Sequence, residues 1–136
     1  MRELTIDATL ENIGPVTGFV NEALEGLGCP AWIQYQIDVA IDELFGNIAR
    51  YAYRPGIGPA TVTVEVTKAP PAVVVTFVDQ GVPYDPLARE DPDVSLPLEE
   101  REEGGLGIFL VKKTMDDVSY EYREGRNILR IKKHLP

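Results

Sequence analysis

The longest helical pattern in the chain runs from about Pro30 to Tyr53, and it requires a core to pack against. Its apolar residues recur at steps of three and four, so at about 100° per residue they fill one arc of the helix. The arc consists of Ile33, Ile37, Ala40, Ile41, Leu44, Phe45, Ile48 and Ala52. Because an amphipathic helix buries its apolar stripe, this arc must face the interior of the molecule.

A polar cluster borders this arc. On the same helical wheel Glu43, Asn47 and Arg50 fall within roughly 60° of one another, just beyond one margin of the apolar residues. A carboxylate and a carboxamide one turn apart at the edge of a core can line a pocket. An isolated pair of this kind is more commonly an ordinary polar helix edge, so its function depends on partners elsewhere in the chain.

The remaining patterns place this helix in an α+β fold. Alternation of polar and apolar residues predicts strands, and steps of three and four predict helices. We predict strands at 2–8, 61–67, 72–78, 118–122 and 128–132, and helices at 11–27, 30–53 and 108–115. This order predicts a two-layer sandwich, in which helices pack on one face of a mixed, mostly antiparallel sheet. A length of 136 residues suits a single domain spanning 1–136.

Composition narrows the class of protein. The formal net charge of −9 argues against nucleic acid as a partner, because an acidic protein repels phosphate backbones. No stretch has the length and apolarity of a signal peptide or a membrane span, so we expect a cytoplasmic protein without membrane contact. One cysteine and one histidine cannot form an internal disulfide or a Cys/His zinc cluster.

A carboxylate follows the most apolar strand. Residues 72–78 are apolar on both faces, which predicts a central strand, and Asp79 continues the face that helices cover. A buried carboxylate can accept a hydrogen bond from an exocyclic amine, and Gly81 has no side chain to keep a planar base from the backbone. Asp-x-Gly is also a common turn, so this stretch alone leaves both interpretations open.

A glycine-rich stretch, Gly104-Gly105-Leu106-Gly107, precedes the helix predicted at 108–115. Free amides and the positive end of the helix dipole would suit a phosphate there, although a flexible hinge has the same composition. The spacing is not that of a P-loop. Between Gln80 and Glu103 the regular patterns fail, and a loop of this length in a small domain is usually functional or disordered.

Taken together and in order, these elements resemble the nucleotide site of the GHKL ATPases, the group of gyrase, Hsp90 and histidine-kinase ATP domains. Glu43 and Asn47 match the N box, and Asp79 opens the match to the adenine-binding box. The stretch 105–107 matches the second glycine box, and the resemblance spans nearly the whole chain. Within the group, the chain looks most like the bacterial anti-sigma factor serine kinases. That likeness is carried by Asp79-Gln80-Gly81-Val82-Pro83-Tyr84-Asp85-Pro86, by Glu102-Glu103-Gly104-Gly105-Leu106-Gly107-Ile108-Phe109-Leu110-Val111, and by Met115-Asp116.

The resemblance implies a site for ATP and Mg²⁺. Asp79 would accept a hydrogen bond from the adenine amino group, Asn47 would hold Mg²⁺ through its carboxamide oxygen, and Glu43 would be the general base. Residues 84–106 would form the ATP lid. The residues implied in cofactor binding are Asn47, Asp79, Gly81, Pro83, Gly104, Gly105, Leu106 and Gly107.

The implied activity is phosphorylation of a serine on a small anti-anti-sigma protein by a kinase that otherwise sequesters a sigma factor. Relatives of this kind commonly form homodimers. An alternative is a nucleotide-gated protein-binding module of the same fold that transfers little or no phosphate. A detached histidine-kinase ATP domain is a third interpretation. It is less favoured because no phospho-acceptor helix pair precedes the pattern and His134 lies in a terminal tail.

The chain departs from the family pattern at three places. Tyr51 stands where relatives often have histidine, and its place on the apolar arc predicts a packing role. A basic residue often precedes the second glycine box, whereas this chain has Glu102 and Glu103 there, which leaves Arg101 as the candidate to steady the γ-phosphate. The last strand contains no threonine to accompany the adenine-binding aspartate.

Overall fold

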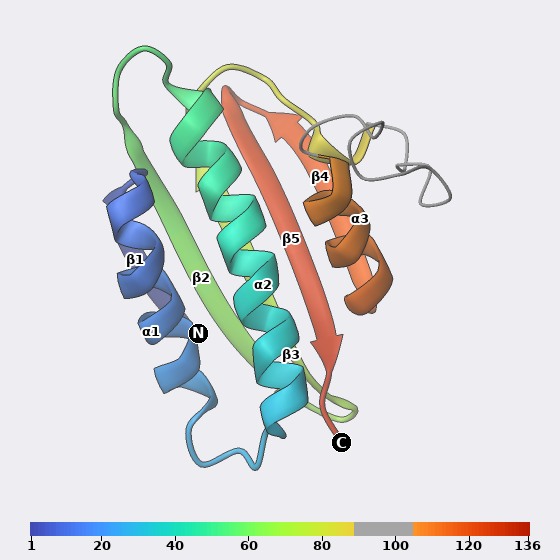
Figure 1. Cartoon of the computed structure of the whole chain (residues 1–136). Helices are drawn as coiled ribbons and strands as arrows, with labels where there is room; N and C mark the ends of the chain where they lie inside the picture. The colour runs from blue at the N-terminus through green and yellow to red at the C-terminus, as the bar shows by residue number, and fades with distance from the viewer. Residues whose placement is uncertain (89–104) are drawn as a thin grey trace.

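The described strands form a single sheet. A computed structural model describes residues 1–88 and 105–136. Its sheet has five strands in the order β1-β2-β3-β5-β4 (Figure 1). Every pairing among these strands is antiparallel, so a sheet predicted to be mixed and mostly antiparallel has no parallel pair in this part of the chain. The strands are β1 (Arg2–Asp7), β2 (Pro59–Lys68), β3 (Pro71–Asp79), β4 (Asp117–Arg123) and β5 (Arg126–His134).

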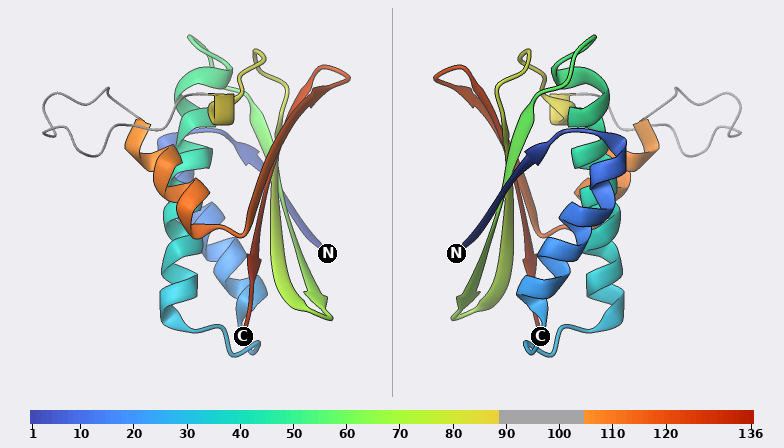
Figure 2. Two further views of the ribbon diagram at one scale, coloured as in Figure 1. Left: turned by 90° about the vertical axis from the view of Figure 1, so that its right-hand side faces the viewer. Right: turned by 90° about the vertical axis from the view of Figure 1, so that its left-hand side faces the viewer.

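The helices α1 (Ile13–Leu24), α2 (Ala31–Asn47) and α3 (Gly105–Thr114) cover one face of this sheet. The side views show the two layers, with the opposite face of the sheet left open (Figure 2). Helix α2 contacts both of the other helices and lies across the middle of the sheet. This arrangement confirms the predicted α+β sandwich. In the described part of the chain, no helix has the length and apolarity needed to cross a membrane.

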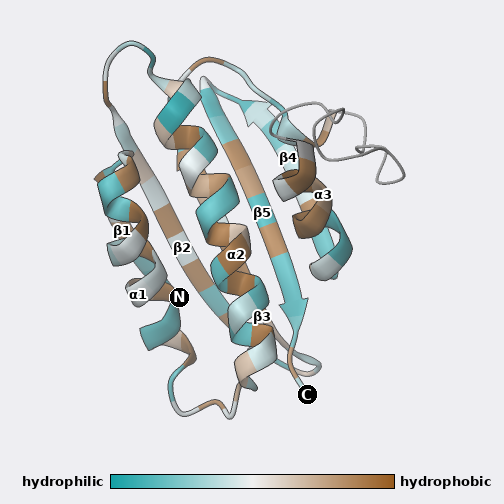
Figure 3. Ribbon diagram, viewed as in Figure 1, coloured by the Kyte–Doolittle hydropathy of each residue, from teal (hydrophilic) through white to brown (hydrophobic). Residues whose placement is uncertain are grey.

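Alternation along the strands builds the core between the layers. Figure 3 shows apolar and polar residues alternating along β2 and β5. In β2, Val62 and Val64 are buried under the helices, whereas the neighbouring Thr61 and Thr63 are partly exposed. Strand β3 lies between β2 and β5, as its apolar sequence predicts, and its inward residues Val73, Val75 and Phe77 are all buried.

Local sequence predicts the β4–β5 turn correctly but places the start of α3 too late. The β4–β5 hairpin turns at Glu124 and Gly125, which have φ of 54° and 77°, as the sequence predicts for a tight two-residue connection. Helix α3 begins at Gly105, earlier than the predicted start at 108. The glycines therefore belong to the first turn of the helix. Their low helix propensity excluded them from the sequence pattern.

The end of the long helix differs from the prediction. After Asn47 the chain continues as a π-helix, η2 (Ile48–Ala52), which closes hydrogen bonds over a wider turn than an α-helix. Ile48 and Ala52 remain buried, but Tyr51 is 41% exposed. The prediction that Tyr51 packs in the apolar arc is therefore wrong, because the wider turn changes the angular position of every residue after Asn47.

Candidate functional site

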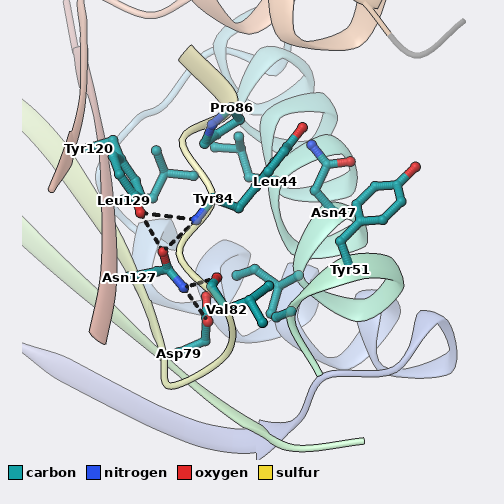
Figure 4. A pocket seen from close by; sticks show the side chains of 12 residues that line it. Leu44, Asn47, Tyr51, Asp79, Val82, Tyr84, Pro86, Tyr120, Asn127 and Leu129 are labelled. Atoms are coloured by element: carbon teal, nitrogen blue, oxygen red, sulfur yellow. Dashed lines mark hydrogen bonds between the residues drawn. The ribbon is translucent and has the colours of Figure 1, made fainter. Parts of the chain in front are cut away.

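A pocket lies between the end of α2 and the sheet, at the end of β3 and the start of β5 (Figure 4). Most of its wall is apolar. Asn47 from the helix and Asp79 from the sheet border the same pocket, so the structure brings together two residues that the sequence singled out separately. The lining residues are Leu44, Asn47, Ile48, Tyr51, Ala52, Asp79, Val82, Tyr84, Pro86, Tyr120, Asn127 and Leu129.

Asp79 is the last residue of β3 and is 5% exposed. Its Oδ1 atom accepts hydrogen bonds from the backbone N–H of Gly81 and from Nδ2 of Asn127, both at 2.9 Å. Among the residues that the structure describes, none donates to the other carboxylate oxygen, Oδ2. Oδ2 is therefore suited to accept a hydrogen bond from a bound ligand.

Asn127 is a site residue that sequence reasoning missed. It lies directly opposite Asp79 in the register of β3 and β5, and it is also 5% exposed. Nδ2 donates to Val82 O at 2.9 Å as well as to Asp79, and Oδ1 accepts from the Tyr84 backbone N–H at 3.1 Å. The signal in the sequence is an amide side chain at an inward position of the last strand, the strand in which relatives commonly have a threonine beside the aspartate.

Gly81 is fixed by contact with the end of the long helix. A Cβ atom added at Gly81 would overlap the backbone carbonyl of Ala52, so only glycine allows this approach. The neighbouring Val82 N–H donates to Ala52 O at 3.0 Å. Tyr53 reinforces the junction, because its hydroxyl donates to Pro59 O at 2.6 Å and accepts from the Gln80 N–H at 2.8 Å. The chain that follows Asp79 is thereby anchored to the end of η2 and, through Tyr53, to β2.

Glu43 lies one helical turn before Asn47 on α2 and is half-buried. A Cβ atom added at Gly107 would overlap the Glu43 carboxylate, so the glycine lets α3 approach this side chain. Burial raises the pKa of the Glu43 carboxyl, and the negative charge of Asp42 raises it further, while Arg50 partly opposes both effects. A half-buried carboxylate with an increased proton affinity is suited to act as a general base.

The other predicted site residues take different positions. Gly105, Leu106 and Gly107 form the first turn of α3, where backbone N–H groups have no intrahelical partner and can bind an anion. They do not line the pocket, and they meet the site through Glu43. Pro83 is exposed and is not among the lining residues, unlike its neighbours Val82 and Tyr84.

Arg101, Gly104 and most of the predicted ATP lid at 84–106 lie outside the described residues.

The pocket is narrow in this structure. Its cavity volume is about 30 Å³, whereas typical ligand pockets enclose roughly 300–1,000 Å³. The rings of Tyr51 and Tyr84 flank it with their centroids 6.1 Å apart, and the backbone of Tyr84 is held by Asn127. A purine would therefore need a wider pocket than this one.

The donor set fits a metal that is shared with a ligand. Within the described ranges, no group of three or more His, Cys, Asp or Glu side chains could hold a metal ion alone. Mg²⁺ at nucleotide sites commonly uses one or two protein oxygens and completes its shell with phosphate oxygens and water. The Asn47 carboxamide at the pocket border, with the Glu43 carboxylate one turn away, is compatible with that mode of binding.

Comparison with known proteins agrees with this geometry. One relative is the serine/threonine-protein kinase BtrW of Bordetella bronchiseptica, 29% identical over 104 residues that cover 76% of this chain and 72% of the relative. Another is the serine-protein kinase RsbW of Bacillus cereus, 28% identical over 131 residues that cover 93% and 74%. These relatives confirm the resemblance to the serine kinases of the group.

Solved structures show the same fold. The crystal structure of the RsbU and RsbW domains of Rv1364c from Mycobacterium tuberculosis superposes with a TM-score of 0.67 at 16% identity, covering 99% of this chain and 33% of the other. A histidine kinase domain from Erythrobacter litoralis EL346 gives a TM-score of 0.53 at 14% identity, covering 93% and 60%. The family model for the histidine kinase-like ATPase domain matches residues 6–133, and the chain therefore belongs to that family.

Proposed function

We propose that this protein is an ATP-dependent serine kinase that phosphorylates an anti-anti-sigma protein and otherwise sequesters a sigma factor. One observation carries the proposal. Asp79 and Asn47 border a single pocket, and Glu43 lies one turn before Asn47 on α2, next to Gly107 in the first turn of α3. A base-recognising carboxylate, a metal-binding amide and a basic carboxylate thus follow one another along one side of the molecule.

The pocket would hold the adenine. Asp79 Oδ2 accepts a hydrogen bond from the exocyclic amino group, and the apolar wall, including Leu44 and Ile48, contacts the ring. The phosphates would then extend along α2 toward Asn47 and Glu43. The free N–H groups at the start of α3 bind phosphate oxygens there.

Catalysis would require alignment and a proton acceptor. ATP supplies the phosphoryl group when bound, and Mg²⁺ supplies charge neutralisation on the phosphates. Asn47 holds the metal, while the Glu43 carboxylate accepts the proton of the attacking serine hydroxyl. The raised pKa of Glu43 suits this task, because a stronger base accepts a proton more readily.

The relatives support the proposed class of partner. BtrW and RsbW are named serine kinases, and the sequence resembles the bacterial anti-sigma factor serine kinases. An acidic protein, with a net charge of −9, is an unsuitable partner for nucleic acid, so regulation would act through proteins. We expect the whole chain to act as one cytoplasmic ATPase domain, with homodimer formation as in relatives of this kind.

The test is transfer of radiolabelled phosphate from ATP to a candidate anti-anti-sigma protein encoded beside this chain. We expect the label on one serine of the partner, and its replacement by alanine in the partner should abolish labelling. ATP-dependent partner binding without labelling would reject the kinase and favour the nucleotide-gated binding module.

A further inference from the structure

Asn127 makes the densest set of polar contacts at the candidate site. It joins β5 to the end of β3, to the loop that follows β3, and to β4. Its Nδ2 donates to Asp79 Oδ1 and to Val82 O, both at 2.9 Å, with Gly81 O at 3.4 Å. Its Oδ1 accepts from the Tyr84 N–H and from the Tyr120 hydroxyl.

These contacts fix which way the amide faces. The nitrogen is surrounded by a carboxylate and two carbonyls, all acceptors, and the oxygen by an N–H and a hydroxyl, both donors. A flipped amide would oppose acceptor to acceptor on one side and donor to donor on the other. Because both N–H bonds and the oxygen of Asn127 are used within the protein, Asn127 has no group left to read a base directly.

The orientation of Asn127 has a consequence for Asp79. Oδ1 of Asp79 is held by Asn127 and by the Gly81 N–H at 2.9 Å each, on a side chain that is 5% exposed. The carboxylate is therefore locked in one rotation, and Oδ2 is the oxygen that remains for a ligand. An oxygen that can only accept favours a 6-amino group and disfavours a 6-oxo group, which would present a second acceptor.

We propose that Asn127 is a positioning residue that sets the base specificity of the site by locking the Asp79 carboxylate so that Oδ2 faces the 6-substituent of a purine. This inference rests on the nucleotide binding in the proposed function, and it extends that function to a residue which itself does not touch the base. The same amide holds the Tyr84 N–H at 3.1 Å, so base recognition is tied to the first residues of the predicted lid.

The test measures how much the 6-amino group contributes to affinity. ATP and purine riboside triphosphate, which lacks only that group, are titrated by calorimetry against the full chain. The native protein should prefer ATP roughly ten- to a hundredfold, as expected for a hydrogen bond to a carboxylate. In Asn127→Asp, which keeps the shape and the acceptor toward Tyr84 but replaces the donor toward Asp79 by an oxygen, this preference should nearly disappear.

Two further variants separate positioning from general support. Tyr120→Phe removes the hydrogen bond on the opposite side of the Asn127 amide, so it should weaken both nucleotides alike and keep the preference for ATP. Asn127→Leu removes the donor without adding a charge, and it carries the test if the aspartate variant does not fold.

The outcomes distinguish the inference from the proposed function. If either folded Asn127 variant retains the native preference, or if Tyr120→Phe loses it equally, Asn127 does not position Asp79. A native protein that phosphorylates its partner but binds the two nucleotides equally would also overturn the inference, and would leave the kinase activity in place.

Discussion

The two ends of the candidate site are built differently. At the base end, Asp79 and Asn127 are each 5% exposed and linked to each other at 2.9 Å in a network that also holds Gly81, Val82 and Tyr84. At the proposed phosphate end, Glu43 is only half-buried, and Gly107 of α3 lies so close to its carboxylate that an added Cβ would overlap it. One end carries a carboxylate held by hydrogen bonds to its neighbours, whereas the other carries a partly desolvated carboxylate.

In the proposed function, this difference corresponds to two chemical tasks. Recognition of a base requires an acceptor whose direction is fixed before the ligand arrives, because fixed groups lose little entropy on binding. Proton acceptance requires a carboxylate whose ionised form is less well stabilised, and the raised pKa of Glu43 follows from its burial and from Asp42 nearby. Substitutions at the two ends should therefore affect different steps.

The largest effect is expected at the phosphate end, in phosphotransfer. Glu43→Gln keeps the size of the side chain and removes the proton acceptor, so transfer should fall about 10²–10⁴-fold while ATP affinity is retained. Single-turnover transfer from saturating Mg²⁺-ATP to the partner serine, beside an ATP titration, measures both quantities. Near-native transfer by this variant would leave catalysis to alignment and charge neutralisation, and the distinction between the two ends would lose its chemical meaning.

At the base end the expected effect is on binding. Asp79→Asn can present an amide donor where the adenine amino group needs an acceptor, so ATP affinity should fall roughly ten- to a hundredfold. Calorimetry on the folded variant measures the change. Transfer at saturating ATP should fall much less than in Glu43→Gln, and unchanged affinity would remove Asp79 from the site.

Sequence patterns predict the burial of Asp79 better than they predict the contacts of Glu43, because burial depends on position within one strand. Alternation along β3 places Asp79 on the buried face, and the structure agrees, with Val73, Val75 and Phe77 on that face. Periodicity reports only the environment of a residue within its own element. The partner of Asp79 lies 48 residues away on β5, and the pairing register that joins them has no signal in either strand alone.

The phosphate end depends on features that local patterns describe poorly. The approach of Gly107 to Glu43 is a contact between helices that are distant in the sequence. The π-helix after Asn47 changes the angular positions that a regular helical wheel assumes, which is why Tyr51 is exposed at the pocket border. Arg101 and Gly104 lie outside the described residues, so their assignment to the phosphates stays a prediction.

The contact between the helices offers a smaller test. Gly107→Ala places a methyl group against the Glu43 carboxylate, so the end of this flexible side chain must move aside. Gly18→Ala is the matched control, because Gly18 lies within α1 with no other atom within 4 Å of an added Cβ. Chemical denaturation should show a gain of roughly 0.5–1 kcal/mol for Gly18→Ala, because alanine has a higher helix propensity than glycine, and a clearly smaller gain or none for Gly107→Ala. Phosphotransfer should fall only in the former, and equal behaviour of both variants would disprove the contact.

The smallest expected effect is on the stability of the phosphate end itself. Because the pKa of Glu43 is raised in the folded state, ionising this carboxyl disfavours folding. The penalty is absent below the unfolded-state pKa, grows as the pH rises from that value through the raised folded pKa, and is constant above it. Glu43→Gln removes the penalty, so the variant should be slightly more stable than the native chain at neutral pH and should lose this advantage in acid.

Glu22→Gln, at an exposed position of α1, removes the same charge without relieving burial and serves as the control. Urea midpoints of the three proteins at neutral and acid pH measure the difference. The Glu43→Gln gain could instead match the Glu22→Gln change at both pH values. Glu43 would then be as well solvated as a surface carboxylate, and the proposed contrast between a hydrogen-bonded base end and a partly desolvated phosphate end would fail.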